Sequence, residues 1–292
     1  MHTVPKRNGA GLPSFIAVGP QRTATTWLYA MLADHLWLPE GVKETKFFDL
    51  HYAKGLKWYA AHFTHCPLDK KIAEIAPTYF HSSEARLRIR RTLPECKIIC
   101  TLRDPVERLF SLYRLMLQYG MTRLPFEDAL EQQPEMMESS RYAFNVAGWL
   151  ELFGSENVRV MFHQDLEADP KSYIAEVCAF VGIPLFTPAA AALRVNEAGR
   201  AARNYHLARL GQNLADWLRA HQLYPVLNIA KSIGLREVFF GNGQVVQRPN
   251  AATAARLRER LTPEVERLEI LVGRNLSSWK AATTPQGATQ PS

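Results

Sequence analysis

The chain has 292 residues, of which 47% are hydrophobic and 22% are charged. This composition is that of an ordinary globular protein and excludes a fibrous or an intrinsically disordered chain. The formal net charge of +7 favours an anionic partner, such as a nucleotide, a glycan, a nucleic acid or an acidic membrane, without choosing among them. The length allows one large or two small domains, and the order of the predicted elements favours one.

The first predicted elements are a strand, a loop and a helix. Residues 1–13 are polar and lack the apolar core of a signal peptide, so we expect a flexible terminus ahead of a domain spanning residues 14–280. Residues 14–19 (SFIAVG) predict a buried strand, and residues 23–36 carry apolar side chains at helical spacing. The loop between them, GPQRTATT, offers unpaired N–H groups and the positive end of a helix dipole to an anion. A simple turn with a Thr helix cap is the alternative.

The same order of elements returns twice. Residues 97–102 predict a second buried strand, after which Asp104 is expected to cap a helix that begins at Pro105. Residues 157–162 predict a third strand, and the helix after it is expected to end at Gly182. From about residue 189 the pattern is helical, and residues 281–292 are expected to be disordered.

This alternation predicts an α/β fold: a single P-loop-like domain with a central, mostly parallel sheet flanked by helices and a helical C-terminal part. In such sheets ligands bind beyond the carboxyl ends of the strands, so the loops after the strands are the candidate sites.

Other features of the sequence argue against several kinds of partner. The four cysteines form no C-x-x-C pair and no zinc-type cluster with His, so we expect free, mostly buried thiols and no metal. The basic cluster of Arg86, Arg88, Arg90 and Arg91 has the spacing of a solvated helix face, so we expect no nucleic acid partner. No stretch approaches the roughly 18 apolar residues of a membrane span, and a cytoplasmic location is expected. The sequence does not indicate an oligomeric state.

The first loop resembles the 5′-phosphosulfate loop of sulfotransferases that use 3′-phosphoadenosine 5′-phosphosulfate (PAPS). That family's pattern P-K-[ST]-G-T-T-x-L aligns with residues 21–28, QRTATTWL. Its 3′-phosphate pattern, R-x-P-x-x-R-x-x-S, is matched by residues 103–111. Further segments are similar to the glycan-type branch, which includes bacterial members: KETKFFD at 43–49, EIAPTYF at 74–80, DLEADP at 165–170 and LVGRNLSSW at 271–279.

The resemblance implies a transferase that moves a sulfuryl group from PAPS to a hydroxyl or amine by in-line displacement, with no metal. The donor-binding residues that it implies are Arg22, Thr23, Ala24, Thr25, Thr26, Arg103 and Ser111. It also implies Glu44 as the general base and Arg22 as a cation that stabilises the leaving group. The acceptor stays open among glycans, lipids and small molecules.

Three positions depart from the family pattern. Arg22 occupies the position where the family usually has Lys, so the compact ammonium is replaced by a wider, planar guanidinium. Ala24 stands at a Gly, which is harmless only if the position needs no positive φ. Ile75 stands where the branch often has Lys, so we take Lys46 as the hypothetical source of that catalytic cation.

Several alternatives remain open from the sequence. Glu44 lies between Lys43 and Lys46, so it is either the base or an exposed ion-pair residue, with His51 and His62 as reserve bases. The aromatic residues that are candidates to line an acceptor cleft are Phe47, Phe48, Trp58, Tyr59, Tyr142 and Trp149. For the last two, helical spacing favours the core instead. The competing functions are a P-loop kinase or NTPase, whose loop Lys is missing, and a catalytically weakened nucleotide-binding protein of the same fold.

Overall fold

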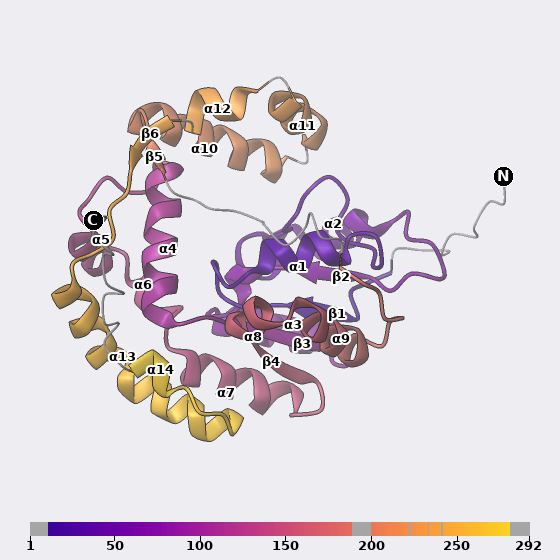
Figure 1. The fold of residues 1–292 in the computed structure, drawn as a ribbon. Coiled ribbons are helices and arrows are strands. Elements are labelled where there is room, and N and C mark those ends of the chain that lie inside the picture. Colours follow the sequence, from indigo (N-terminus) through magenta and orange to yellow (C-terminus); the bar gives the residue numbers. More distant parts are fainter. Residues whose placement is uncertain (1–10, 189–199, 222, 233, 241, 281–292) are drawn as a thin grey trace.

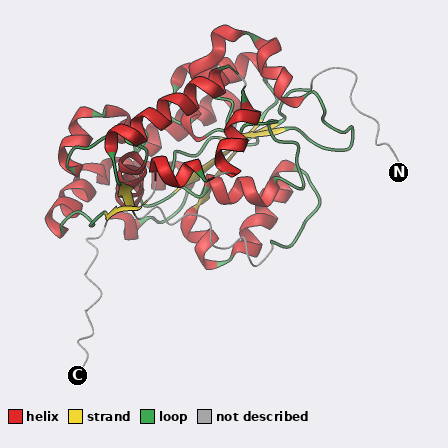
Figure 2. Cartoon of the chain, turned by 90° about the horizontal axis from the view of Figure 1, so that it is seen from above, coloured by secondary structure: helices red, strands yellow, loops and turns green. Residues whose placement is uncertain are grey.

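A parallel sheet of four strands forms the centre of the computed structural model, which describes residues 11–188, 200–221, 223–232, 234–240 and 242–280. The strands are β1 (Phe15–Ala17), β2 (Ala73–Ile75), β3 (Lys97–Leu102) and β4 (Val158–Phe162), and their order in the sheet is β2-β1-β3-β4. Helices surround the sheet (Figures 1 and 2). The α/β class and the three strands expected from apolar runs are confirmed. The expectations for residues 1–10 and 281–292 lie outside the described residues.

Successive side chains of each strand point to opposite faces of the sheet and pack into a separate hydrophobic core on each face. Ile16 and Ile98 are register partners on β1 and β3, and both point into the core that is completed by α3 (Ser83–Thr92) and α7 (Tyr142–Phe153). Ala17 and Ile99 point into the opposite core with α1 (Thr25–Leu32) and α9 (Pro170–Val181). Burial on both faces explains why these strands are continuously apolar in sequence.

The helix boundaries follow the predicted capping residues. The Asp104 carboxylate accepts hydrogen bonds from the backbone N–H groups of Val106 (2.9 Å) and Glu107 (3.0 Å), and α4 (Pro105–Gln118) begins at the next residue. Arg258, from α13 (Ala251–Val272), also binds Asp104 at 2.8 Å. Helix α9 ends at Gly182, which has a φ of 72° as expected for a helix end. The Asp104 cap and both predicted boundaries are therefore confirmed.

Short elements complete the fold. Between β1 and α4 lie the π-helical turn η1 (Phe47–His51), the 3₁₀ turns η2 (Tyr52–Lys54), η3 (Ala61–Phe63) and η4 (Pro77–Tyr79), and helix α2 (Leu56–Ala60). Later helices are α5 (Phe126–Gln132), α6 (Pro134–Glu138), α8 (His163–Ala168), α10 (Tyr205–Ala220), α11 (Tyr224–Ser232), α12 (Leu235–Phe240) and α14 (Ser277–Lys280). The antiparallel pair β5 (Arg200–Ala202) and β6 (Asn242–Val245), which the sequence did not predict, joins the C-terminal helices.

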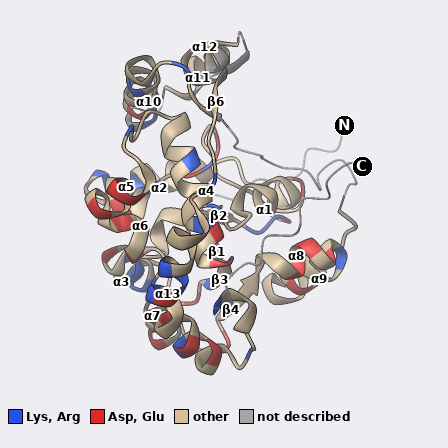
Figure 3. Ribbon diagram, turned by 60° about the vertical axis from the view of Figure 1, so that its left-hand side comes forward, with Lys and Arg blue, Asp and Glu red and all other residues tan. Residues whose placement is uncertain are grey.

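Two arginines from the sequence motifs are structural. Arg86 is buried rather than solvated, because its guanidinium donates to the carbonyl of Asn145 (3.2 Å) and lies over the Trp149 ring. Arg108 is fully buried and donates to the Met136 carbonyl and the Ser140 hydroxyl. The prediction of a solvated face on α3 is thus wrong at Arg86. Lys and Arg are interspersed with Asp and Glu over the helices (Figure 3).

Candidate active site

The loop between β1 and α1 is anchored to the neighbouring strand β3. A Cβ atom on Gly19 would lie 1.9 Å from the Thr101 hydroxyl oxygen, so only glycine fits there. The buried Thr23 hydroxyl donates to the Pro20 carbonyl (2.7 Å) and lies 2.7 Å from the Thr101 hydroxyl. These bonds occupy the Thr23 hydroxyl, so this side chain stabilises the loop. Thr23 can then contact a ligand through its backbone.

Two residues of this loop adopt left-handed backbone conformations. Arg22 has a φ of 77°, and Ala24 has a φ of 70° with a ψ of 18°. Position 24 therefore does need a positive φ, so the alanine found there in place of the family's glycine is not harmless. A non-glycine residue in this region costs about 1–2 kcal/mol. Backbone strain of this kind is typical of functional loops.

We expect Ala24→Gly to raise the free energy of unfolding by about 0.5–1 kcal/mol. The relief of the left-handed strain exceeds the added flexibility of glycine in the unfolded chain. Urea unfolding of the two proteins measures the difference. Ala33→Gly is the matched control, because Ala33 has right-handed helical angles and the same change should destabilise there. A loss of stability in Ala24→Gly as large as in Ala33→Gly would contradict the strain.

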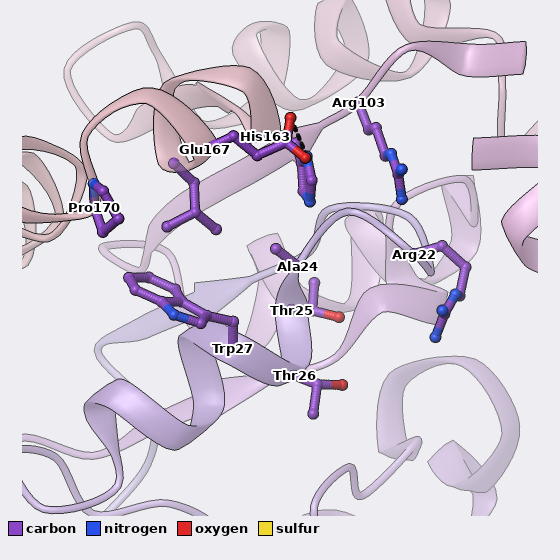
Figure 4. A pocket seen from close by; sticks show the side chains of 10 residues that line it. Arg22, Ala24, Thr25, Thr26, Trp27, Arg103, His163, Glu167 and Pro170 are labelled. Carbon is purple, nitrogen blue, oxygen red and sulfur yellow. Dashed lines mark ion pairs between the residues drawn. The ribbon is translucent and has the colours of Figure 1, made fainter. Parts of the chain in front are cut away.

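A cleft of about 560 Å³ opens where the loop meets the carboxyl ends of β3 and β4. Its lining residues are Arg22, Ala24, Thr25, Thr26, Trp27, Arg103, His163, Leu166, Glu167 and Pro170. In Figure 4 Arg22 and Arg103 lie together on one side of the loop, and Trp27 and Pro170 lie on the other. Five of the predicted site residues thus line one cleft, and Ser111 joins them through a hydrogen bond from Arg22.

Positive charge is concentrated on one side of the cleft. The Nε atom of Arg22 donates to the Ser111 hydroxyl at 2.9 Å, which links the two sequence motifs directly. Burial lowers the pKa of Arg22, and the charges of Arg103 and Arg114 lower it further. Within the described residues, no carboxylate forms an ion pair with Arg22 or Arg103. Like charges held together in this way are suited to an anion with more than one charged group.

His163 and Glu167 line the cleft but were not singled out from the sequence. The His163 ring lies 3.3 Å from the Glu167 carboxylate, and burial, followed by the charge of Arg103, lowers its pKa. His163 directly follows β4. The rule that sites lie after strand ends would have pointed to it.

Lys43 joins the predicted base to the loop. Its ammonium donates to the Thr26 hydroxyl at 3.0 Å and to the Glu44 carboxylate at 3.2 Å. The Glu44 side chain is 18% exposed, so it is partly withdrawn from water. Lys46 has a left-handed backbone (φ 51°) and directly precedes η1, and the hydrogen bonds of the described residues place Lys43, not Lys46, at the loop.

The fully buried carboxylate of Glu74 holds the segment that carries Lys43 and Glu44. It lies on β2 and accepts hydrogen bonds from the backbone N–H (2.9 Å) and hydroxyl (2.6 Å) of Thr45, and from the Tyr59 hydroxyl (2.7 Å). Burial raises its pKa to about 6 against the opposing effect of these bonds. Because Thr45 adjoins Glu44, these bonds fix the backbone that carries the predicted base. The next residue, Ile75, is fully buried and packs in the apolar core with α1, so β2 supplies no cation.

Some other candidates are excluded by their packing. Both ring nitrogens of His62 are engaged, Nδ1 by the Trp58 and Tyr59 carbonyls and Nε2 by the Tyr224 hydroxyl at 2.8 Å, so His62 is not a free base. The prediction that Phe47, Phe48 and Tyr59 line an acceptor cleft is wrong, because all three are buried core residues. The predicted core positions of Tyr142 and Trp149 and the free, buried state of all four cysteines are confirmed.

A family model for the sulfotransferase domain matches residues 12–197. The chain belongs to the sulfotransferase-domain family. The matched range contains the loop, Glu44, Arg103, Ser111 and His163, so the resemblance stated from the motifs is confirmed at the level of the family.

Individual relatives agree with this assignment. The chain is 31% identical over 198 residues to the mouse bifunctional heparan sulfate N-deacetylase/N-sulfotransferase 4, a match that covers 59% of the chain and 22% of that relative. It is 38% identical over 138 residues to the membrane-associated sulfotransferase kil1 of Dictyostelium discoideum, covering 44% of the chain and 29% of the relative. The matches thus span less than a third of either relative.

The crystal structure of a sulfotransferase from Alicyclobacillus acidocaldarius shares the fold. The TM-score is 0.67 at 20% identity, and the superposition covers 93% of this chain and 100% of that one. Within the described residues, no helix is long and apolar enough to cross a membrane, and no group of three or more His, Cys, Asp or Glu is arranged to hold a metal.

Proposed function

We propose that the protein transfers a sulfuryl group from PAPS to an acceptor hydroxyl or amine. The observation that carries this proposal is the contact between Arg22 and Ser111, beside Arg103. PAPS bears a phosphosulfate at one end and a phosphate at the other end of its ribose. The loop with Arg22 suits the first group, and Arg103 with Ser111 suits the second.

The same geometry supports in-line displacement. The acceptor oxygen or nitrogen attacks the sulfur, the bond from sulfur to the 5′-phosphate oxygen breaks, and the acceptor's proton passes to Glu44. Arg22 and the loop N–H groups neutralise the charge that develops on the leaving phosphate. Lys43, between Thr26 and Glu44, is positioned to neutralise the transferring group, in place of the Lys that this chain lacks at Ile75.

A kinase or NTPase is less well supported by the residues at the strand ends. Such an enzyme needs a loop Lys and an Asp that is free to hold magnesium. Asp104 after β3 is bound by Arg258, and Asp165 after β4 forms a bidentate pair with Arg274 at 2.5 and 2.6 Å. Both carboxylates therefore serve to hold α13 and its C-terminal end against the sheet.

Thermal unfolding with nucleotides tests the donor assignment. Adenosine 3′,5′-bisphosphate, the desulfated donor, should raise the unfolding temperature, and ATP with magnesium should not; ligand at 100 times its dissociation constant stabilises by about 2.7 kcal/mol. A screen of hydroxyl and amine acceptors with radiolabelled PAPS then tests transfer. Stabilisation by ATP with magnesium alone would overturn the proposal, and stabilisation by the bisphosphate without any transfer would identify a binding protein of the same fold.

We expect Lys43→Met to lower kcat by about 10²-fold, the effect typical of removing one donor to a developing negative charge. The assay is transfer from radiolabelled PAPS to an acceptor found in the screen. Lys46→Met is the matched control and should retain nearly full turnover, which would also exclude the hypothesis that Lys46 supplies the cation. A large loss in Lys46→Met with none in Lys43→Met would reverse the assignment.

A further inference from the structure

Helices α10, α11 and α12 form a lobe that lies beyond one end of α4 and outside the residues matched by the family model (Figure 1). The first residue of α11, Tyr224, joins this lobe to the part of the domain that holds the 40–46 segment, in which Lys43 and Glu44 lie. The Tyr224 hydroxyl lies 2.8 Å from Nε2 of His62, a buried residue of η3.

The Tyr224 ring also packs directly on the backbone of Gly41. A Cβ atom at Gly41 would lie 2.6 Å from Cδ2 and 2.8 Å from Cγ of the ring, so no larger side chain fits there while the ring is in place. Gly41 has a φ of 76°, a conformation that glycine adopts without strain. The contact therefore lies on the main chain of the 40–46 segment, three residues before Glu44.

His62 is oriented so that its Nε2 atom faces Tyr224. Its Nδ1 atom lies 3.1 Å from the carbonyl oxygens of both Trp58 and Tyr59, so Nδ1 carries the ring proton and Nε2 accepts from the Tyr224 hydroxyl. Burial lowers the pKa of His62, which favours this neutral ring. The backbone carbonyl of His62 accepts a hydrogen bond from the N–H of Glu40 at 2.9 Å. His62 thus links Tyr224 to the start of the 40–46 segment.

The 40–46 segment is therefore held near both of its ends. At Thr45, the Glu74 carboxylate of β2 accepts the backbone N–H at 2.9 Å and the hydroxyl at 2.6 Å. At Gly41, the Tyr224 ring lies against the main chain. Glu44 lies between these two supports, of which one comes from the central sheet and the other from the lobe.

We propose that Tyr224 is a positioning residue for transfer: its contacts with Gly41 and His62 fix the backbone that presents Glu44 to the acceptor. The inference rests on the proposed function and assigns the lobe a part in it. Donor binding should not depend on Tyr224, because Arg22 is held by Ser111 of α4. Displacing a catalytic group by about 1 Å costs up to about 10²-fold in rate, so loss of the contact should appear in kcat.

Truncation of Tyr224 gives the first test, with radiolabelled PAPS and an acceptor from the screen, well below the unfolding temperature. Tyr224→Ala should lower kcat at least about tenfold, and Tyr224→Phe, which keeps the ring on Gly41, should lose less. The KM for PAPS and the unfolding shift with adenosine 3′,5′-bisphosphate should stay at wild-type values. Tyr205→Ala is the matched control, because it removes the same side chain from the first residue of α10 and should leave kcat unchanged.

A second test displaces the Tyr224 ring without removing it. Gly41→Ala places a methyl group against the ring and should also lower kcat at least about tenfold. Gly273→Ala is the control, because Gly273 has a φ of 64° and nothing within 4 Å of an added Cβ atom, so it adds backbone strain without a clash. The double variant Gly41→Ala/Tyr224→Ala should be about as active as Tyr224→Ala, since the two changes remove one contact.

The outcomes separate this inference from the proposed function. If Tyr224→Ala and Gly41→Ala unfold at lower temperature but keep the wild-type kcat, Tyr224 only stabilises the lobe and the inference is wrong. If both variants lose the bisphosphate shift, the damage extends to the donor site, which also contradicts it. A wild-type protein that neither responds to the bisphosphate nor transfers a sulfuryl group counts against the proposed function, and the inference falls with it.

Discussion

Glu44→Gln is expected to lower kcat by about 10²–10⁴-fold, the range over which a positioned general base contributes to rate. The glutamine keeps the size of the side chain and can still accept the hydrogen bond from Lys43, so the segment should hold its place. What it removes is the ability to take the acceptor's proton. The measurement is single-turnover transfer from radiolabelled PAPS at saturating acceptor, with the bisphosphate-induced unfolding shift recorded in parallel.

The alternative role of Glu44, as an ion-pair partner of Lys43, makes a different prediction. A partly exposed pair contributes roughly 0–1 kcal/mol, so its loss would change stability slightly and kcat by only a few-fold. Glu95→Gln is the control, because Glu95 is exposed and follows α3, away from the cleft. A kcat in Glu44→Gln within about threefold of the Glu95→Gln value would remove Glu44 from the mechanism and leave His51 as the remaining reserve candidate.

The elements that sequence predicts well are those with strong local signals. Residues 97–102 become β3 with the predicted boundaries, because the five residues that follow Lys97 are all apolar or β-favouring and all become buried. Asp104 followed by Pro105 determines the start of α4 through local hydrogen bonds alone. Arg22 and Arg103, which the resemblance assigned to one donor site, do line one cleft, because both follow strands of one parallel sheet, whose carboxyl ends share an edge.

The features that sequence did not predict depend on contacts between distant segments. Arg86 on α3 has the spacing of a surface residue, and only the packing of α7 against α3 buries it beside Trp149. Lys43 and Lys46 are only three positions apart in the sequence. The backbone turns at Lys46, which has a left-handed conformation, and it is Lys43 that contacts the loop between β1 and α1. The burial of Glu74 likewise depends on Thr45 and Tyr59, which are 29 and 15 residues away.

Replacing Glu74 with alanine is expected to lower the free energy of unfolding by about 3–5 kcal/mol. The change removes the acceptor for the N–H and hydroxyl of Thr45 and for the hydroxyl of Tyr59, and leaves buried donors without partners. Urea unfolding measures the loss. Glu74→Gln, which keeps an acceptor oxygen for Thr45, should lose much less stability. Equal losses in the two variants would show that the charge of the group, rather than its hydrogen-bond acceptance, supports the fold.

The pH dependence of stability separates these contributions further. Burial raises the pKa of Glu74 from 4.5 to about 6, so between these values the folded protein binds more protons at this site than the unfolded chain does. The group's contribution is fully present below pH 4.5 and is lost as pH rises through 6, by about 2 kcal/mol at 1.36 kcal/mol per pKa unit. Glutamine does not titrate, so Glu74→Gln should gain about 2 kcal/mol relative to the wild-type protein between pH 4.5 and pH 7.5. If the stability difference between Glu74→Gln and the wild-type protein does not change with pH, the Glu74 carboxylate stays ionised through this range. In that case Thr45, and with it the backbone of Glu44, is held by a buried charged carboxylate and not by a protonated one.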